Sequence, residues 1–201
     1  MRVVASALAL ATALAACHEG ANGAAGSAST TALASASASS APSAAGGCPR
    51  FHGATVERTA TGPAASAVLA GATAGESGCT AQVTFEFQAA SDTRPPGYTV
   101  KYVDPNVQPF LDGDPPRPIS VTGRAFLLVQ LAPASSEDPS QPDHGYRGNL
   151  SLDLSGASHV TMVRKLPDAN GAVVWVIGLD GVRPFAVDAA EVPTRVTVLI
   201  G

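Results

Sequence analysis

Residues 83–88 of this 201-residue chain are Val-Thr-Phe-Glu-Phe-Gln, and this short stretch decides the class of fold. Its apolar side chains stand at 83, 85 and 87, and its polar ones at 84, 86 and 88. Because successive side chains of a β-strand point to opposite faces, this alternation predicts a strand that is buried on one face. The same period returns in residues 160–162, Val-Thr-Met, and in residues 195–200, Arg-Val-Thr-Val-Leu-Ile, which are also predicted strands.

Further strands are expected on both sides of this stretch, and turn-forming residues separate them. The additional strand candidates are residues 55–59, 67–70, 98–103, 125–131, 150–154, 173–179 and 185–187. Clusters of Pro, Gly, Asp and Asn at 95–97, 112–116, 168–171 and 180–181 predict turns. No stretch of twelve or more residues shows a capped helical period. Many short strands joined by such turns indicate a sandwich or a barrel, and we expect an all-β fold with a single antiparallel β-sandwich-like domain.

The N-terminal segment has a different character from the strands. Arg2 is followed by small and apolar residues from 3 to 16, broken only by Ser6 and Thr12. As a helix this run would span about 21 Å, short of the roughly 30 Å of a bilayer core, so residues 1–16 are predicted to be a signal peptide. The run ends in Leu-Ala-Ala-Cys at 14–17, which resembles the lipobox of bacterial lipoproteins. That resemblance implies lipidation of Cys17, with fatty acyl chains such as palmitate; an ordinary secretory signal with a chance cysteine is the alternative.

Residues 17–47 are predicted to form a tether. They are almost all Ala, Ser, Gly and Thr, with a single charge at Glu19, and nothing in them can build a core. A flexible chain of 30 residues has a root-mean-square reach of about 30 Å. An Ala-rich helix is the alternative, disfavoured by the frequent Ser and Gly and by the lack of charge pairs. We therefore expect residues 48–201 to form a domain held by lipid on the extracytoplasmic face of the cell membrane.

The cysteine count supports an exported protein. The chain has three cysteines, and an odd number in an exported protein needs a separate explanation, which lipidation of Cys17 supplies. Cys48 and Cys79 remain, in an environment that permits disulfides, so we predict that they pair. A metal pair or a reactive thiol are the alternatives, but the sequence lacks a CxxC spacing and a nearby group of histidines.

Composition and motifs argue against several functional classes. Twelve Lys and Arg stand against sixteen Asp and Glu with no basic cluster, so nucleic acid is not an expected partner. The sequence has no nucleophile elbow, Walker loop or dinucleotide fingerprint, and the histidines at 18, 52, 144 and 159 lack metal-ligand spacing. We expect no enzyme activity, no cofactor and no metal, although a hydrolase whose carboxylates gather only in space stays open. Asp104, Asn106, Asp112 and Asp114 are predicted to lie in solvated turns rather than in an ion site.

One polar loop carries the candidate ligand-binding residues. Residues 135–148 form a connection that is longer than usual, and such loops are either functional or merely mobile. Within it, Tyr146 and Arg147 offer an aromatic ring and a cation, which suit a sugar or a carboxylate. Trp175, Tyr98 and Tyr102 are further aromatic candidates, but their positions on strand faces favour core packing over ligand contact.

Several spaced motifs together resemble a known family. They include Pro-Gly-Tyr-Thr-Val-Lys-Tyr-Val at 96–103, Gly-Arg-Ala-Phe-Leu-Leu-Val-Gln-Leu at 123–131 and Pro-Thr-Arg-Val-Thr-Val at 193–198. With residues 83–87, 160–164, 175–179 and 184–187, they resemble the AMIN-like domain of actinobacterial lipoproteins over about residues 66–200. Two positions depart from that family's pattern. Gln82 stands where many members have Arg, and Leu199 stands where an Asp is common.

The resemblance implies an exported, β-sandwich-like domain without known catalysis. AMIN domains proper localise proteins at the cell envelope and bind peptidoglycan, and the transfer of that property rests on analogy. We therefore expect a non-enzymatic, membrane-anchored envelope lipoprotein that binds cell-wall glycan (peptidoglycan) or localises at the envelope. The alternative is a protein–protein interaction or assembly factor of the envelope that pairs through an exposed edge strand and binds no glycan.

Overall fold

A computed structural model describes residues 50–88, 94–113, 115–138, 140–154 and 157–201. The predicted signal peptide (1–16), the predicted tether (17–47) with Cys17, and Cys48 lie outside the described residues. All described residues belong to one compact unit. Across the described ranges, no helix has the length and apolarity needed to cross a membrane.

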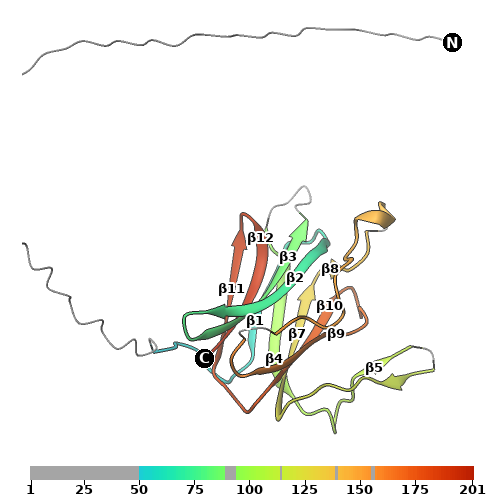
Figure 1. Ribbon diagram of the computed structural model, residues 1–201. Coiled ribbons are helices and arrows are strands. Elements are labelled where there is room, and N and C mark those ends of the chain that lie inside the picture. The colour runs from blue at the N-terminus through green and yellow to red at the C-terminus, as the bar shows by residue number, and fades with distance from the viewer. Residues whose placement is uncertain (1–49, 89–93, 114, 139, 155–156) are drawn as a thin grey trace, which may run out of the picture. The chain divides into compact units, whose positions relative to one another are not determined.

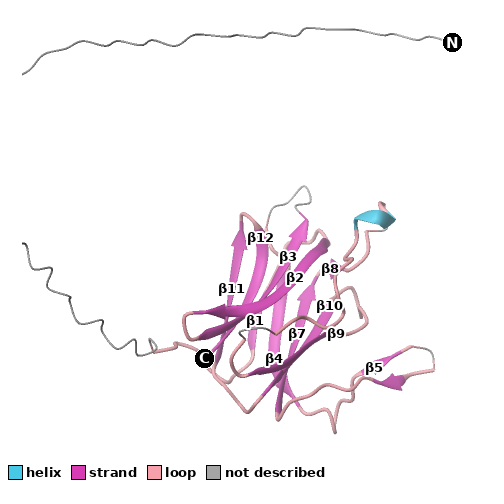
Figure 2. Cartoon of the chain, viewed as in Figure 1, coloured by secondary structure: helices cyan, strands magenta, loops and turns pink. Residues whose placement is uncertain are grey.

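The described chain is an all-β sandwich, as the sequence predicts (Figures 1 and 2). Sheet I is antiparallel, with the strand order β1 (Arg58–Ala60), β4 (Gly97–Val103), β7 (Ala125–Ala132), β10 (Val173–Leu179) and β9 (Val160–Lys165). Sheet II has the order β11 (Phe185–Glu191), β12 (Thr194–Ile200), β3 (Thr80–Gln88), β2 (Ala67–Ser77) and β8 (Ala134–Ser135), with only the β2–β8 pair parallel. A small hairpin, β5 (Leu111–Asp112) and β6 (Arg117–Pro118), and one 3₁₀ turn, η1 (Pro142–His144), complete the elements.

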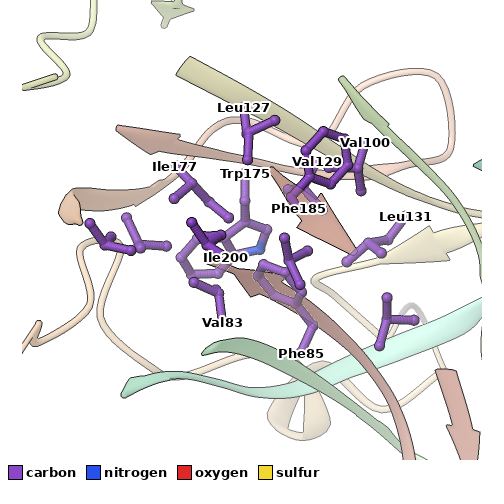
Figure 3. Packing of buried hydrophobic residues seen from close by; sticks show 14 of the residues in the cluster. Val83, Phe85, Val100, Leu127, Val129, Leu131, Trp175, Ile177, Phe185 and Ile200 are labelled. Carbon is purple, nitrogen blue, oxygen red and sulfur yellow. The ribbon is translucent and has the colours of Figure 1, made fainter. Parts of the chain in front are cut away.

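The main core lies between the two sheets and is formed by alternate residues of their strands (Figure 3). Val83, Phe85 and Phe87 of β3 point into it, whereas Thr84, Glu86 and Gln88 do not. Trp175 of β10 is fully buried, and its ring centroid lies 5.4 Å from that of Phe85. The strand alternation predicted at 83–88 and at 195–200 is thereby confirmed.

A second apolar cluster covers the other face of sheet I. Val174 and Val176 of β10 point away from the main core and pack with Phe110 and Leu128. Phe110 belongs to the long connection between β4 and β7, and Ile119 and Val121 of the same connection pack against this cluster. Strand β10 is therefore buried along its whole length, which accounts for its unbroken apolar sequence.

Some predicted strands are corrected by the structure. The strand expected at 150–154 is an irregular segment with one isolated bridge, from Ser151 to Arg164. The strand expected at 55–59 is shifted to β1, and those expected at 67–70 and 185–187 extend to residues 77 and 191. A register shift between Gly178 and Leu179 interrupts the alternation of β9, so Val163 rather than Met162 is fully buried.

Candidate functional site

Tyr146, which the sequence predicts as a ligand contact, is partly buried and packs against the main core. Its ring meets the ring of Trp175 edge to face, with centroids 5.8 Å apart. Its hydroxyl donates a hydrogen bond to the carbonyl oxygen of Asn149 at 2.8 Å, and partial burial raises its pKa. A side chain at Gly148 would overlap the Tyr146 phenol, so the chain fits closely around this ring. Most of the Tyr146 contacts are therefore structural.

Arg147 lies on the surface beside Tyr146. Its guanidinium is 3.6 Å from the Asp143 carboxylate, and the two side chains are 68% and 101% exposed. An ion pair so exposed contributes little to stability. The structure places Tyr146, but not Arg147, in the wall of a groove, and a ligand contact by either residue stays a prediction.

The groove at Tyr146 runs beside strand β2. It has a volume of about 320 Å³ and separates residues 70–74 of β2 from the segment that follows Tyr146. Its other lining residues from that segment are Gly148, Asn149, Leu152 and Asp153. One wall is thus small and apolar, and the other combines an aromatic ring with amide and carboxylate groups.

The polar loop of residues 135–148 is fixed at its base. The backbone N–H and the hydroxyl of Ser136 donate to the two oxygens of Asp168, at 2.6 and 2.9 Å. Lys165 Nζ donates to the same carboxylate at 2.7 Å, and its side chain is only 9% exposed. The N–H of Tyr146 also donates to the Ser136 carbonyl at 2.7 Å. These bonds hold both ends of the loop against sheet I.

The richest polar cluster of the described chain lies where β10 ends, and no sequence pattern predicted it. Arg183 donates from Nε and Nη2 to the two oxygens of Asp180, at 3.1 and 3.0 Å. His159 Nδ1 lies 3.0 Å from Asp180 Oδ2. The hydrogen bonds from Arg183, and to a smaller extent the one from His159, lower the pKa of Asp180 to about 2. Because the carboxylate is ionised and accepts only, His159 Nδ1 must carry the proton in this bond.

Tyr102 and Glu76 bring neighbouring strands into this cluster. The Tyr102 hydroxyl donates to the Arg183 carbonyl at 2.6 Å and accepts from the Arg183 N–H at 2.8 Å. Burial raises the pKa of Tyr102. At the end of β2, Glu76 accepts from the hydroxyl and the N–H of Ser158 at 2.6 and 3.1 Å, which lowers its pKa. Tyr102 thereby fixes the backbone that follows Asp180.

Beside this cluster opens a cleft of about 520 Å³, here named the Arg124 cleft. It is lined by Tyr102, Val103, Asp104, Pro105, Asn106, Arg124, Ala125, Phe126 and Val182. Arg124 is exposed, and within the described part of the chain its guanidinium makes no hydrogen bond or ion pair. Its backbone N–H donates to the Leu179 carbonyl at 2.7 Å, which fixes its position at the end of β10.

The polar and aromatic groups of the Arg124 cleft are partly committed to one another. The Asn106 amide donates to Asp104 Oδ1 at 2.9 Å, and the Asn106 N–H donates to the same oxygen at 2.8 Å. The Phe126 ring is held edge to face by Phe110, with centroids 6.2 Å apart. The cleft therefore presents a fixed ring, an amide oxygen and a cation, which can bind the apolar face and the carboxylate of a ligand.

The remaining sequence candidates have structural positions. Trp175 is buried in the main core and Tyr98 and Tyr102 pack against it, as predicted, while Tyr102 also lines the Arg124 cleft. Among the described residues, no group of three or more His, Cys, Asp or Glu side chains could hold a metal ion. Asp104 and Asn106 form a turn and Asp112 lies in the β5–β6 hairpin, while Asp114 lies outside the described residues.

The two positions that depart from the family pattern face each other. Gln82 of β3 and Leu199 of β12 are register partners, and Gly75 of β2 is the partner of Gln82 on its other side. Cys79 lies in the turn between β2 and β3, and because Cys48 lies outside the described residues the pairing of the two cysteines stays a prediction.

Comparison with known proteins agrees with this architecture. The AMIN-like domain family matches residues 67–200, from the first residue of β2 to the last residue of β12. No curated protein and no solved structure was found to match the chain.

Proposed function

Since this chain belongs to the AMIN-like domain family, whose members are extracytoplasmic and associated with the cell envelope, we propose that it is a non-enzymatic lipoprotein that binds peptidoglycan. The observation that carries the ligand is the Arg124 cleft. Peptidoglycan offers sugar rings with apolar faces and carboxylates on its lactyl and peptide groups. The Phe126 ring and the Arg124 guanidinium supply the complementary partners in one cleft.

The exposed cation of the Arg124 cleft supports an anionic ligand in particular. The Arg124 guanidinium is exposed and bonds to no other described residue, so the described chain leaves its donors available for a planar carboxylate. The neighbouring Arg183 is, by contrast, committed to Asp180. Arg124 is therefore the residue that we assign to recognition, and Arg183 is the residue that holds the wall of the cleft in place.

The titratable groups beside the cleft support binding without catalysis. A general acid or base works best with a pKa near the working pH. The pKa of Asp180 is instead held at about 2, and the pKa of Glu76 is lowered by Ser158. The Ser158 hydroxyl donates to Glu76, which leaves it directed at a carboxylate rather than at a histidine base. These carboxylates stay ionised and serve as fixed hydrogen-bond acceptors.

The membrane anchor belongs to the same proposal and rests on the sequence ending at Cys17. Two acyl chains on that cysteine would hold the protein stably in a membrane, since one chain alone binds only marginally. Changing Cys17 to Ser should move the protein from the membrane fraction to the soluble extracytoplasmic fraction. Retention of the Cys17→Ser variant in the membrane would contradict lipid anchoring at this residue.

Binding is tested by sedimentation of the full-length protein, in detergent, with purified cell-wall sacculi. The wild type should co-sediment, and Arg124→Ala should weaken retention by about ten-fold, the loss of one charge-assisted contact of about 1.4 kcal/mol. Arg58→Ala removes the same charge from an exposed position on β1 and is the matched control. No retention of the wild type, or equal loss in both variants, would refute glycan recognition by this cleft.

A second candidate function is protein–protein interaction in the envelope without glycan binding. The observation that favours it is the edge of strand β2, where residues 71–77 pair with β3 on one side only within the described chain. An unpaired strand edge is a template for another strand. Retention of Arg124→Ala at wild-type levels would leave this candidate in place.

A further inference from the structure

Strand β2 presents a long free edge in sheet II. It pairs with β3 from Val68 to Ser77, with a register shift that leaves Ala70 without a partner in β3, whereas on the other side β8 pairs only with Ala67 and Val68. Beyond that short pair, no backbone hydrogen bond between described residues crosses the outer edge of residues 70–77. Eight residues of strand at about 3.4 Å each leave an unpaired edge of roughly 27 Å.

The other long edges of the sandwich are protected in ways that β2 is not. Strand β9 is covered, because the Leu152 N–H donates to the Val163 carbonyl at 3.0 Å and the Lys165 N–H donates to the Leu150 carbonyl at 2.7 Å. Strand β11 is capped by Ala54 at Phe185 and carries exposed acidic residues at 188 and 191. Strand β1 is only three residues long. Residues 67–75 of β2 contain neither a charge nor a proline, and the protections on this strand are limited to the register shift between Leu69 and Gly71 and the charge of Glu76 near its end.

Two glycines of β2 are not required by a close contact, and only Gly71 has another explanation within the chain, the register shift beside it. A Cβ at Gly75 would meet nothing within 4 Å, and one at Gly71 would meet only the Glu86 side chain, at 3.5 Å. Neither residue has the left-handed backbone that favours glycine. Glycine inside a strand costs roughly 0.5–1 kcal/mol relative to Ala, and it is often found where another backbone approaches closely. The described chain supplies no such backbone on the open side of β2.

We propose that the free edge of β2 binds an extended segment of a partner polypeptide, which adds a strand to sheet II. The inference rests on the second candidate function and names its surface and its partner. An added strand would lie about 4.8 Å from β2 and would direct alternate side chains toward the Tyr146 groove. Tyr146 and Leu152 line that groove, so the segment carries apolar side chains at alternate positions.

The groove favours such a segment over a second copy of this chain. In a symmetric pairing of two β2 edges, each strand would offer only the Ala, Gly and Thr side chains of residues 70–75. These are too small to fill a groove of about 320 Å³ that ends on an aromatic ring. A partner with larger alternate side chains fills the space and pairs with the backbone at once.

The test uses the full-length protein in nanodiscs and a synthetic peptide with the sequence of β3, residues Thr80–Gln88, as probe. This sequence already pairs with β2 and alternates apolar and polar side chains. Hydrogen exchange of the amides of residues 70–77 should slow by at least about ten-fold with saturating peptide. A scrambled peptide with its apolar residues placed together should have no effect. Equal protection by both peptides, or by neither, would overturn the proposal whether or not any variant folds.

Variants then locate the site. In Ala74→Lys, a charged side chain beside the groove should abolish the protection, because a lysine on an edge strand opposes pairing. Ala189→Lys places the same residue on β11 and should leave it unchanged. Arg124→Ala should also bind the peptide normally, and Ala74→Lys should still bind sacculi, so the two proposals fail separately. If the wild type dimerises and Ala74→Lys abolishes the dimer, the occupant of the edge is a second copy of this chain and the proposal of a partner segment is overturned.

Discussion

Gly178 of β10 is a position where one added methyl group should strongly destabilise the fold. A Cβ at this residue would overlap the carbonyl oxygen of Thr122 and lie 3.0 Å from Thr161 Oγ1. The Thr161 hydroxyl donates to that same carbonyl at 2.6 Å, so the substitution acts on a bonded contact. Forcing a methyl into such a site costs about 1–3 kcal/mol, and loss of the hydrogen bond adds about 0.5–1.5 kcal/mol. We expect Gly178→Ala to lower the free energy of unfolding by about 3 kcal/mol.

Thermal unfolding measures this loss directly. For a domain of this size each kcal/mol changes Tm by about 2–4 °C, so Gly178→Ala should melt roughly 6–12 °C below the wild type. Gly75→Ala is the matched control, since its methyl would meet nothing within 4 Å. It should leave Tm unchanged or raise it, because alanine restricts the unfolded chain. A Gly178→Ala protein that melts within about 2 °C of the wild type would refute the argument from packing.

The same substitution should disturb the Arg124 cleft. Thr122 lies two residues before Arg124, and the Arg124 N–H is bonded to the Leu179 carbonyl at 2.7 Å. Displacing the Thr122 carbonyl from Gly178 therefore moves the segment that carries the guanidinium. Gly178→Ala should weaken retention on sacculi at temperatures where it is still folded, whereas Gly75→Ala should not.

Three further outcomes are expected. The pKa of Asp180 is lowered from 3.8 to about 2, so its ionised form stabilises the fold above about pH 4 and this contribution is lost as the pH falls through about 2. Urea unfolding at about pH 5 and about pH 2.5 should accordingly show a smaller acid-induced loss in Asp180→Asn than in the wild type, and an equal loss would contradict the ion pair. Tyr146→Phe should lower the free energy of unfolding by about 0.5–1 kcal/mol, and Tyr146→Ala should lower it by about 2–3 kcal/mol. Tyr146→Ala should also shift the fluorescence emission of Trp175, the single tryptophan, to the red, and an unshifted spectrum would contradict the contact between the two rings. Gln82→Arg and Leu199→Asp place opposite charges on two register partners, so a double-mutant cycle should give a coupling free energy of unfolding of about 0.2–1 kcal/mol. A coupling of zero would contradict the pairing of residues 82 and 199.

The fold could be predicted from the sequence where the determining signal is local. The alternation of residues 83–88 needs no knowledge of the rest of the chain, because the strand's own geometry separates its two faces. Residues 160–162 show the limit of that argument. The register shift opposite Gly178 lies in the pairing of β9 with β10, and it is Val163 that reaches the core. A bulge of this kind depends on the partner strand and leaves no mark on the period of the first few residues.

The candidate site could not be predicted, because its parts are distant in the sequence. The Arg124 cleft joins the end of β4, the start of β7 and the loop after β10. Only the short spacing between Asp180 and Arg183 was visible locally, and a spacing of three residues is too common to indicate a site. His159 and Tyr102 reach that pair across 21 and 81 residues. Tyr146 could be selected from the sequence because it is an aromatic residue in a polar loop, but its contact with Trp175 could not be predicted.

The two glycines of β2, Gly71 and Gly75, made the second half of this strand difficult to predict from the sequence. Residues 71–77 were not predicted as strand, because Gly71 and Gly75 lower strand propensity and no apolar alternation surrounds them. In a central strand such glycines would forfeit packing on both neighbours. At this edge, pairing with β3 holds the strand through Ser77, and within the described chain β8 adds a pair only at Ala67 and Val68. Because side chains project from the faces of a sheet rather than along its edge, the backbone groups of β2 decide whether this edge accepts another strand, and opposing that pairing with a single lysine is the decisive experiment.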